Sequence, residues 1–483
     1  MSSLLDQDGL TQAEQLRRGE VSSRELVASA IERIEALDPV IHAVSVKRYE
    51  RALEEAAQLS GAAQRRSPFA GVPFLLKDLG PTCAGSPATC GSAFMAGVVP
   101  TADSELVKRF LAAGLIVIGK TNTAEFGALP TTEPAFGGAT ANPWDIERSV
   151  GGSSGGAAAA VAARYVAAAH ANDAGGSIRI PASCCGVFGL KTTRARVPMG
   201  PNVGDLMNGL ACEFVVSRTV RDSAALLDAV AGPAIGDPYV APPKPASYLE
   251  ALGAGPPRRL RITVTPYRPG ELHPDCQRAV DEAAALCGEL GHEVMYETPP
   301  VRFSTLRELF LIVWSAGVSS AIAGFAALTG RKPSPEKFED VTWWLYEEGQ
   351  RISAARYLVT ITQLQQAARR LAEFHERHDV HLSTVTAEPA PRLGVLNAGS
   401  PTACLERALD FVADTPLANL TGEPAMSVPL HRCNHGLPVG VHFTGRFGDE
   451  VTLLALAAQL ESARPWNINS ISSDSSRRKQ PPS

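Results

Sequence analysis

An alanine-rich apolar run occupies residues 157–169, and a Gly-Gly-Ser sequence stands on each side of it. Alanine lets a helix pack closely against its neighbours, and Arg164 interrupts the run, so we expect a buried helix over 157–163 and not a membrane span. The first Gly-Gly-Ser sequence lies in Gly151–Gly156 and the second in Asp173–Ser177. Glycines beside a serine leave backbone N–H groups unobstructed, as a site for a developing oxyanion requires.

Short apolar runs alternate with helical patterns along most of the chain. Residues 71–76 are apolar and predict a buried strand that ends at Lys77. Residues 104–113 have a helical pattern, 114–119 predict the next core strand, and 259–265 predict another strand ahead of a further helix. This alternation indicates an α/β fold. The length of 483 residues suffices for one large domain or two ordinary ones.

Composition also suggests how the chain is organised. We expect a helical N-terminal segment over residues 1–65, a core over 66–232 that holds both Gly-Gly-Ser sequences, and a further portion over 258–466. Residues 233–257, between these two portions, are rich in Pro and Gly. The tail, 467–483, is rich in Ser, Arg and Pro, and we expect it to be disordered.

The overall composition excludes several classes of protein. Hydrophobic residues make up 45% and charged residues 20% of the chain, as in a soluble globular protein. A net charge of −5 gives no electrostatic reason to expect nucleic acid or an anionic membrane as a partner. The N-terminus has no secretory pattern, and no stretch approaches about 20 uninterrupted apolar residues, so no transmembrane helix is expected.

Cysteine and histidine spacing predicts neither a disulfide framework nor a metal site. Nine cysteines in a chain of this length suit reduced thiols in a cytoplasm, and the adjacent pair Cys184-Cys185 suits apolar packing. The ten histidines are scattered without His-x₃-His or Cys-x-x-Cys spacing. No Gly-x-Gly-x-x-Gly or P-loop pattern occurs, so we expect no metal, nucleotide or other cofactor.

Lys77, Ser153 and Ser177 together form a set that can run acyl transfer without histidine or metal. Each has an ordinary interpretation when taken alone: a lysine after a strand is usually solvated, Gly-Gly-Ser-Ser-Gly-Gly is often a linker, and Asp-x-Gly-Gly-Ser is often a turn. A serine hydroxyl needs a base to remove its proton. A lysine can be that base only when neutral, and burial favours the neutral form.

Several segments match the amidase signature family in order and spacing, and the chain resembles that family over nearly its whole length. The subgroup most similar in Asn172–Lys191 is the amidases that resemble 6-aminohexanoate cyclic dimer hydrolase. The matching segments are Gly71–Asp78, Gly119–Gly127, Gly151–Gly156, Asp173–Pro181 and Gly186–Lys191, with weaker matches at Arg218–Asp222, Asn419–Ala425 and Pro438–Val441.

The resemblance implies a single large α/β domain with a mixed central sheet sandwiched by helices. It also implies a hydrolase that cleaves the carbon–nitrogen bond of a small carboxylic amide, other than a peptide bond, and whose relatives often form dimers. Ser177 would be the nucleophile, Ser153 the bridge after a cis peptide bond from Gly152, and Lys77 the base. The oxyanion would be bound by the backbone N–H groups of Ala174, Gly175, Gly176 and Ser177.

Other residues near these motifs have open roles. Asp173 and Arg179 flank Ser177, and a structural ion pair is favoured over substrate contact. Asp78 could orient Lys77 or cap the next turn. Phe126, Phe136 and Trp314 are candidates for an apolar acyl pocket, and a core position is at least as well supported for Trp314.

Three alternatives to a small-molecule amidase remain. The amidase subunit of a tRNA-dependent amidotransferase has a similar core, but Asn172 and Ala174 stand where those subunits usually have threonines. A carbamate or ester hydrolase of the same family would pass through the same tetrahedral oxyanion. A binding protein with a dead site is disfavoured by intact Lys77, Ser153 and Ser177. Departures from the family pattern at Val150, Thr192 and 379–386 leave the pocket's specificity open.

Overall fold

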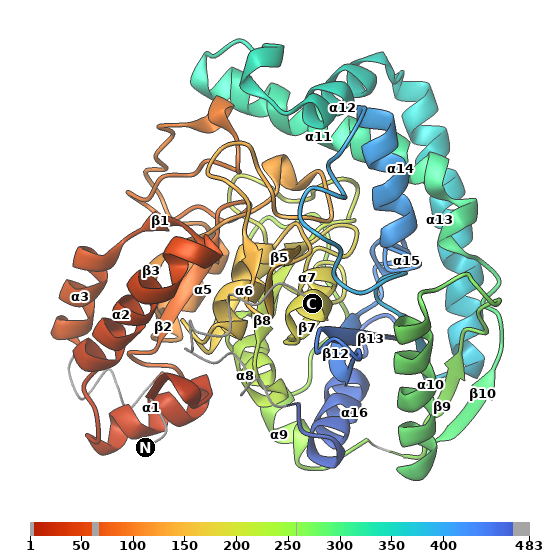
Figure 1. The fold of residues 1–483 in the computed structure, drawn as a ribbon, viewed down its shortest axis with the longest axis horizontal. Coiled ribbons are helices and arrows are strands. Elements are labelled where there is room, and N and C mark those ends of the chain that lie inside the picture. The colour runs from red at the N-terminus through yellow and green to blue at the C-terminus, as the bar shows by residue number, and fades with distance from the viewer. Residues whose placement is uncertain (1–3, 60–66, 257, 467–483) are drawn as a thin grey trace, which may run out of the picture.

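One large mixed β-sheet forms the centre of the molecule, and helices sandwich it (Figure 1). The computed structural model describes residues 4–59, 67–256 and 258–466, so the predicted disordered tail lies outside the described residues. Within these ranges the sheet has 11 strands in the order β1-β3-β2-β6-β8-β7-β12-β13-β11-β9-β10. The predicted α/β class and mixed central sheet are therefore confirmed.

The strands of this sheet, with the two-stranded sheet β4–β5, are β1 (Val44–Lys47), β2 (Pro73–Lys77), β3 (Ile116–Thr121), β4 (Ala141–Asn142), β5 (Asp145–Ser149), β6 (Ala168–Asp173), β7 (Phe188–Lys191), β8 (Cys212–Ser217), β9 (Arg261–Val264), β10 (Glu293–Tyr296), β11 (Val380–Thr384), β12 (Ala425–Arg432) and β13 (Pro438–Gly445).

The α-helices are α1 (Gly9–Arg18), α2 (Ser23–Ile41), α3 (Tyr49–Gln58), α5 (Glu105–Ala112), α6 (Gly155–Ala162), α7 (Arg179–Cys185), α8 (Val220–Val230), α9 (Tyr248–Leu252), α10 (Pro274–Glu289), α11 (Arg307–Thr329), α12 (Asp340–Arg351), α13 (Ala354–Arg377), α14 (Pro401–Phe411), α15 (Leu417–Thr421) and α16 (Glu450–Ala463). Short 3₁₀ turns occur at Leu4–Asp6, Ala93–Met95, Glu125–Gly127, Phe303–Thr305 and Pro335–Lys337.

The middle of the sheet brings the ends of β2 and β6 together. Strand β2 pairs in parallel with both β3 and β6, whereas β6 pairs antiparallel with β8. The antiparallel pair β7–β12 joins this half of the sheet to the half formed by β9–β13. All five residues of β2 are buried, as expected for a central strand with both faces covered.

Helix α6 is the buried alanine-rich helix that the sequence predicted, and all eight of its residues are buried. Its first turn approaches other backbone segments so closely that only glycine fits. A Cβ atom on Gly156 would lie 2.5 Å from the backbone nitrogen of Asn122 and 2.7 Å from the carbonyl oxygen of Ala43. Gly156 is therefore required for packing and is not a linker residue.

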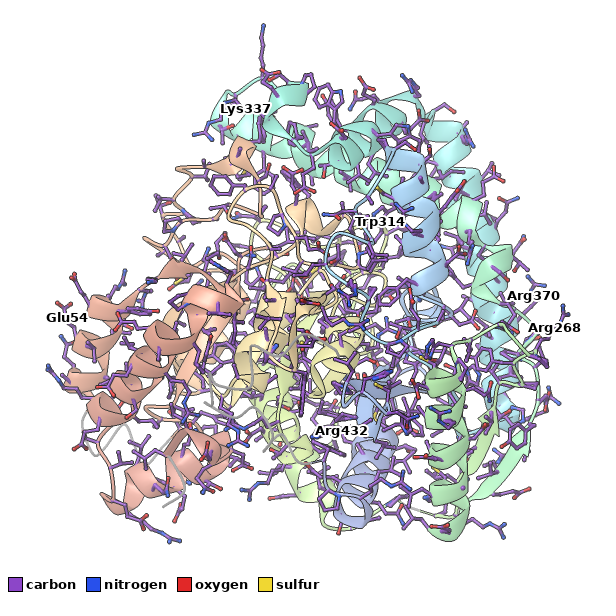
Figure 2. All side chains as sticks on the ribbon, viewed as in Figure 1. Glu54, Arg268, Trp314, Lys337, Arg370 and Arg432 are labelled. Carbon is purple, nitrogen blue, oxygen red and sulfur yellow. The ribbon has the colours of Figure 1, made fainter. Side chains whose placement is uncertain are left out.

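Helices α11 to α14 form a separate apolar layer at the upper right of Figure 1. Figure 2 shows the charged side chains of Glu54, Lys337 and Arg370 at the outer edge of the molecule and Trp314, on α11, within it. Among the described helices, α11 alone is long and apolar enough to cross a membrane, with a mean hydropathy of 1.9. A buried core helix meets the same criteria, and 44% of this apolar window is buried inside the protein.

Two expectations about local structure were incomplete. The N-terminal segment was expected to be helical, but Val44–Lys47 adds β1 to the edge of the sheet beside β3, with its side chains alternating between half-buried and exposed. Residues 233–257, which were left between the core and the further portion as a Pro- and Gly-rich stretch, contain α9, whose Tyr248 is 1% exposed and belongs to the main apolar cluster.

Candidate active site

Lys77 is the last residue of β2, and its side chain is fully buried. Its Nζ lies 2.7 Å from Ser153 Oγ and 2.6 Å from Asn172 Oδ1. Burial lowers the pKa of Lys77 to about 7, although the carboxylates of Glu213 and Asp173 act in the opposite direction. Near neutral pH a large fraction of this amine is therefore unprotonated and able to accept a proton.

Ser153 is fixed by the backbone around it. The peptide bond from Gly152 to Ser153 is cis. A Cβ atom on Gly152 would lie 2.5 Å from the backbone nitrogen of Thr131, so this position also requires glycine. The Thr132 hydroxyl donates to the Gly151 carbonyl at 2.9 Å and accepts from the Gly155 N–H at 3.0 Å, which holds both ends of the segment.

Ser177 lies at the end of the loop that follows β6, and 8% of its surface is exposed. Its segment is joined to that of Ser153, because the Ser154 N–H donates to the Ser177 carbonyl at 3.3 Å and the Ser154 hydroxyl donates to the Asn172 carbonyl at 3.1 Å. The structure thus brings the three residues predicted as a catalytic set to one place, with Lys77 and Ser153 buried and Ser177 on the wall of a pocket.

The loop before Ser177 offers backbone N–H groups, but fewer than predicted. The Asp173 carboxylate turns back and accepts the N–H groups of Gly176, at 2.7 Å, and of Ile178, at 3.1 Å. Such a turn is common after an aspartate, and it removes Gly176 from the four predicted oxyanion donors. Among the described residues, no partner accepts a hydrogen bond from the N–H of Ala174, Gly175 or Ser177, so these three remain available.

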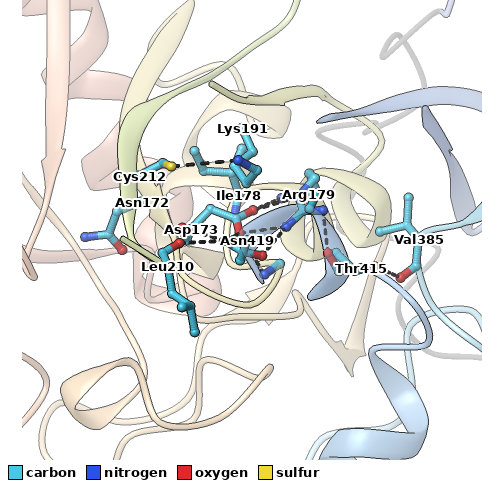
Figure 3. A network of polar contacts seen from close by, with 12 residues as sticks. Asn172, Asp173, Ile178, Arg179, Lys191, Leu210, Cys212, Val385, Thr415 and Asn419 are labelled. Carbon is cyan, nitrogen blue, oxygen red and sulfur yellow. Dashed lines mark hydrogen bonds and ion pairs between the residues drawn. The ribbon is translucent and has the colours of Figure 1, made fainter. Parts of the chain in front are cut away.

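Asp173 and Arg179 form the predicted ion pair, which is fully buried and bidentate, with Arg179 Nε 2.9 Å from Asp173 Oδ2 and Nη2 2.8 Å from Oδ1 (Figure 3). Burial alone would raise the pKa of Asp173, but the charge and hydrogen bonds of Arg179 hold it well below its usual range. Arg179 also donates to the Thr415 carbonyl and to Asn419 Oδ1, both at 2.7 Å. The pair therefore ties the Ser177 loop to α15.

Asp78 neither orients the Lys77 amine nor caps a helix. Its carboxylate accepts the backbone N–H and the hydroxyl of Thr89 and lies 3.5 Å from the buried Lys120 Nζ. It therefore holds the loop after β2 against β3, next to Lys77 but turned to other partners.

An apolar pocket opens beside Ser177. Trp314 and Phe310 of α11 stack with ring centres 5.1 Å apart and form one wall, and the Trp314 indole N–H is directed to the Ala128 carbonyl at 3.3 Å. The other lining residues are Gly127, Ala128, Leu129, Pro130, Gly175, Ile180, Leu311, Leu405, Ala408, Leu409, Val412 and Pro416.

Of the three predicted aromatic residues, only Trp314 lines this pocket. Phe126 packs against Phe325 and Phe338 in the second apolar cluster, with ring centres 6.1 and 5.9 Å away. Phe136 is 38% exposed on the long loop before β4. Proximity in sequence to the Gly119–Gly127 motif was a poor guide, because α11 and α14, which are distant in sequence, cover the pocket.

Sequence reasoning missed three polar residues around Lys77: the buried His170 and Glu213, and the half-buried Asn172. The sequence marked Asn172 only as a position where amidotransferase subunits usually have threonine. Glu213 lies opposite Asn172 in the β6–β8 pair. The sequence alone does not reveal this contact, because it depends on the register of the two strands. As for metals, among residues 4–59, 67–256 and 258–466 no group of three or more His, Cys, Asp or Glu side chains is placed to hold an ion.

Comparison with known proteins gives one consistent match. The family model described as Amidase matches residues 25–454. The chain is 38% identical to a 6-aminohexanoate-cyclic-dimer hydrolase of Pseudomonas sp. (strain NK87) over 95% of both chains. The solved structure of 6-aminohexanoate cyclic dimer hydrolase with substrate superposes with a TM-score of 0.90 at 36% identity, covering 96% of this chain and 98% of that one. A bacterial aryl acylamidase superposes with a TM-score of 0.85 at 26% identity, covering 95% and 96%.

The buried ion pair generates a prediction about stability. Arg179→Met should lower the free energy of unfolding by about 3–5 kcal/mol, because it leaves the buried Asp173 carboxylate without its cation. The exposed pair Arg392–Glu147 offers a control, and Arg392→Ala should cost less than about 1 kcal/mol. Urea denaturation measures both, and equal unfolding midpoints for Arg179→Met and the wild type would contradict the role given to this pair.

Proposed function

The chain belongs to the amidase family and is a hydrolase that acts on amide carbon–nitrogen bonds, and from this premise we propose that its reaction passes through an acyl-enzyme on Ser177. The observation that carries the proposal is the 2.7 Å contact between Lys77 Nζ and Ser153 Oγ at a lysine whose pKa is lowered to about 7. A neutral amine in this position can take the proton of Ser153, which in turn takes the proton of Ser177.

The proposed steps follow from these positions. Ser177 Oγ attacks the amide carbon as its proton passes to Ser153 and the Ser153 proton passes to Lys77. The N–H groups of Ala174, Gly175 and Ser177 stabilise the carbonyl oxygen while it carries negative charge. When the carbon–nitrogen bond breaks, the leaving nitrogen receives a proton back through Ser153. A water molecule then attacks the acyl-enzyme by the same proton path and releases the carboxylic acid.

The proposal also covers the substrate, the partners, the cellular location and the oligomeric state. We propose a small-molecule amide as the substrate, with neither nucleic acid nor a membrane as partner and with no cofactor. A cytoplasmic location is supported by the nine cysteines, all of which are buried and unpaired. The family's dimers motivate a homodimer as the state to test first.

The lining of the pocket supports a proposal about the acyl portion of the substrate. Among the described residues that line it, Ser177 and the Trp314 indole N–H supply the only polar side-chain groups, and none of those residues is charged. A carboxylate or ammonium placed there would lose its hydration without gaining a partner. We therefore propose that the acyl portion of the substrate is uncharged. A cyclic dimer, whose amino and carboxyl groups are joined in amide bonds, meets this requirement and is a suitable first test compound.

Labelling tests the nucleophile. A fluorophosphonate should add once to the wild-type protein, and peptide mapping should locate the adduct on Ser177. Ser177→Ala should fold, resist labelling and lose amide turnover, whereas Ser223→Ala, a buried serine of α8, should be labelled as the wild type is. An adduct on Ser153 or Ser154 would assign the nucleophile to that residue instead.

The pH dependence tests Lys77. Since only the neutral amine accepts a proton, kcat/KM should rise with pH through about 7, the pKa of Lys77. Lys77→Arg and Lys77→Met should both fold and be nearly inactive, because a guanidinium does not deprotonate in this range and methionine has no base. Retention of near wild-type activity by Lys77→Arg would exclude the base role.

Lys77 should also affect stability. Its folded pKa lies below the ordinary lysine value of 10.5, so between about 7 and 10.5 the unfolded chain binds the extra proton. The free energy of unfolding should therefore gain a positive slope with pH in this window, and Lys77→Met should lose that slope.

A pair of anilides tests the pocket. Hexanoyl p-nitroanilide should have a kcat/KM at least about 100-fold above that of 6-aminohexanoyl p-nitroanilide, whose ammonium would enter the apolar pocket. Leu405→Asp places a carboxylate in the lining and should narrow this ratio. Leu358→Asp, on the exposed face of α13, is the matched control and should leave the ratio unchanged. Equal rates for the two wild-type substrates would refute an apolar acyl site.

A further inference from the structure

Lys77 has a second close partner that the proposed reaction does not use. We propose that Asn172 and Glu213 form a positioning unit that directs the lone pair of the Lys77 amine toward Ser153 and holds the lysinium that forms when the amine takes a proton. The inference rests on the proposed role of Lys77 as the base. It adds two residues that act through Lys77 and do not touch the reacting atoms.

The orientation of the Asn172 amide is fixed by its neighbours. Its Nδ2 donates to the Leu79 carbonyl at 2.9 Å and lies 3.4 Å from Glu213 Oε1. A carbonyl and a carboxylate only accept hydrogen bonds, so the amide nitrogen must face them. The amide oxygen then faces Lys77 Nζ, 2.6 Å away, and can only accept.

An acceptor on this side of the amine decides where its lone pair points. Neutral Nζ carries two hydrogens and one lone pair. One hydrogen is directed to Asn172 Oδ1, which leaves the lone pair free to face the Ser153 hydroxyl, 2.7 Å away. Without Asn172 the amine could rotate about its Cε–Nζ bond until its lone pair faced the side that Asn172 Oδ1 now occupies, an orientation that cannot remove the serine proton.

Glu213 is held by a buried histidine. His170 Nδ1 accepts the backbone N–H of Lys77 at 3.2 Å, so the ring proton is on Nε2, which lies 2.8 Å from Glu213 Oε2. His170 and Glu213 are 0% and 3% exposed. The contacts therefore form a closed circuit that leads from the backbone of Lys77 through His170, Glu213 and Asn172 to the side chain of Lys77.

Strand register and packing explain why these residues meet. Asn172 pairs directly with Glu213 in the antiparallel ladder of β6 and β8, and His170 lies two residues earlier on the same face of β6. The circuit has no spare room, because a Cβ atom on Gly80 would lie 2.7 Å from Glu213 Oε1 and 2.8 Å from Asn172 Nδ2. The side chains are therefore confined to this arrangement.

Other charged and titratable groups near Lys77 have partners of their own. Asp173 is paired with Arg179, Asp78 lies beside Lys120, and burial raises the pKa of Cys90 to about 12, which keeps that thiol neutral. Among the described residues, the Glu213 carboxylate has hydrogen bonds only with His170 and Asn172. Its carboxylate is the largest influence that favours the charged form of Lys77 against burial.

The pH profile of kcat/KM in the full-length enzyme, with a neutral anilide as substrate, tests this unit. The acid limb, where activity falls as Lys77 gains a proton, follows the pKa of Lys77. Glu213→Gln removes a negative charge and should move this limb to lower pH by roughly one unit. Asn172→Asp adds a negative charge and should move the limb to higher pH by a similar amount. Asn172→Ala should lower kcat roughly 10- to 100-fold with little change in KM, because the amine loses its orientation. Glu450→Gln alters a buried carboxylate paired with Arg196 and should not move the profile.

A purely structural role would change stability but not the profile. Acid limbs that stay at the wild-type pH in both Glu213→Gln and Asn172→Asp, or in Glu213→Gln alone if Asn172→Asp does not fold, would overturn the positioning unit. The proposed function would still stand if the wild type is labelled on Ser177 and Lys77→Met is inactive. Failure of Ser177 labelling would instead remove the base role on which this inference rests.

Discussion

The burial of the Lys77 amine is the constraint on which the rest of the site depends. An ammonium inside a sheet loses its hydration, so its pKa falls toward neutrality. The buried amine is stabilised in either protonation state by the Ser153 hydroxyl and the Asn172 amide oxygen, which contact it directly. The Glu213 carboxylate lies beyond Asn172 and contacts its amide nitrogen. A carboxylate in direct contact would have kept the lysine charged, and no polar partner at all would have left its hydrogens unsatisfied.

Arg179, which follows Ser177 by two positions, shows the opposite solution for a buried cation. Because a guanidinium does not lose its proton, it is matched by the full charge of Asp173 and by further acceptors on Thr415 and Asn419. The two buried cations therefore have different roles. The permanently charged pair fixes the backbone that carries Ser177, whereas the titratable amine is left able to exchange a proton.

Local sequence predicted the parts of the molecule whose cause is local. The apolar strand before Lys77 and the buried alanine-rich helix both follow from residue type and spacing, and the sheet formed as the alternating pattern predicted. The circuit around Lys77 depends on the register of β6 against β8, and the pocket wall depends on where α11 lies. Neither the strand register nor the position of α11 can be predicted from a short stretch of sequence. This is why Glu213 was missed and Phe136 was placed wrongly.

The residues proposed to perform the chemistry and those proposed to bind the acyl group belong to different parts of the fold. Lys77, Ser153, Asn172 and Glu213 belong to sheet strands or to segments packed tightly against them, where even a Cβ atom on Gly152 or Gly80 would collide with a neighbour. Trp314, Leu405 and Leu409 belong to α11 and α14, which reach the pocket from the outer apolar layer. Under the proposed function, substitutions on those helices would reshape the pocket without disturbing the proton path. The Ser/Ser/Lys set would then perform the reaction, and the side chains of α11 and α14 would select the acyl group.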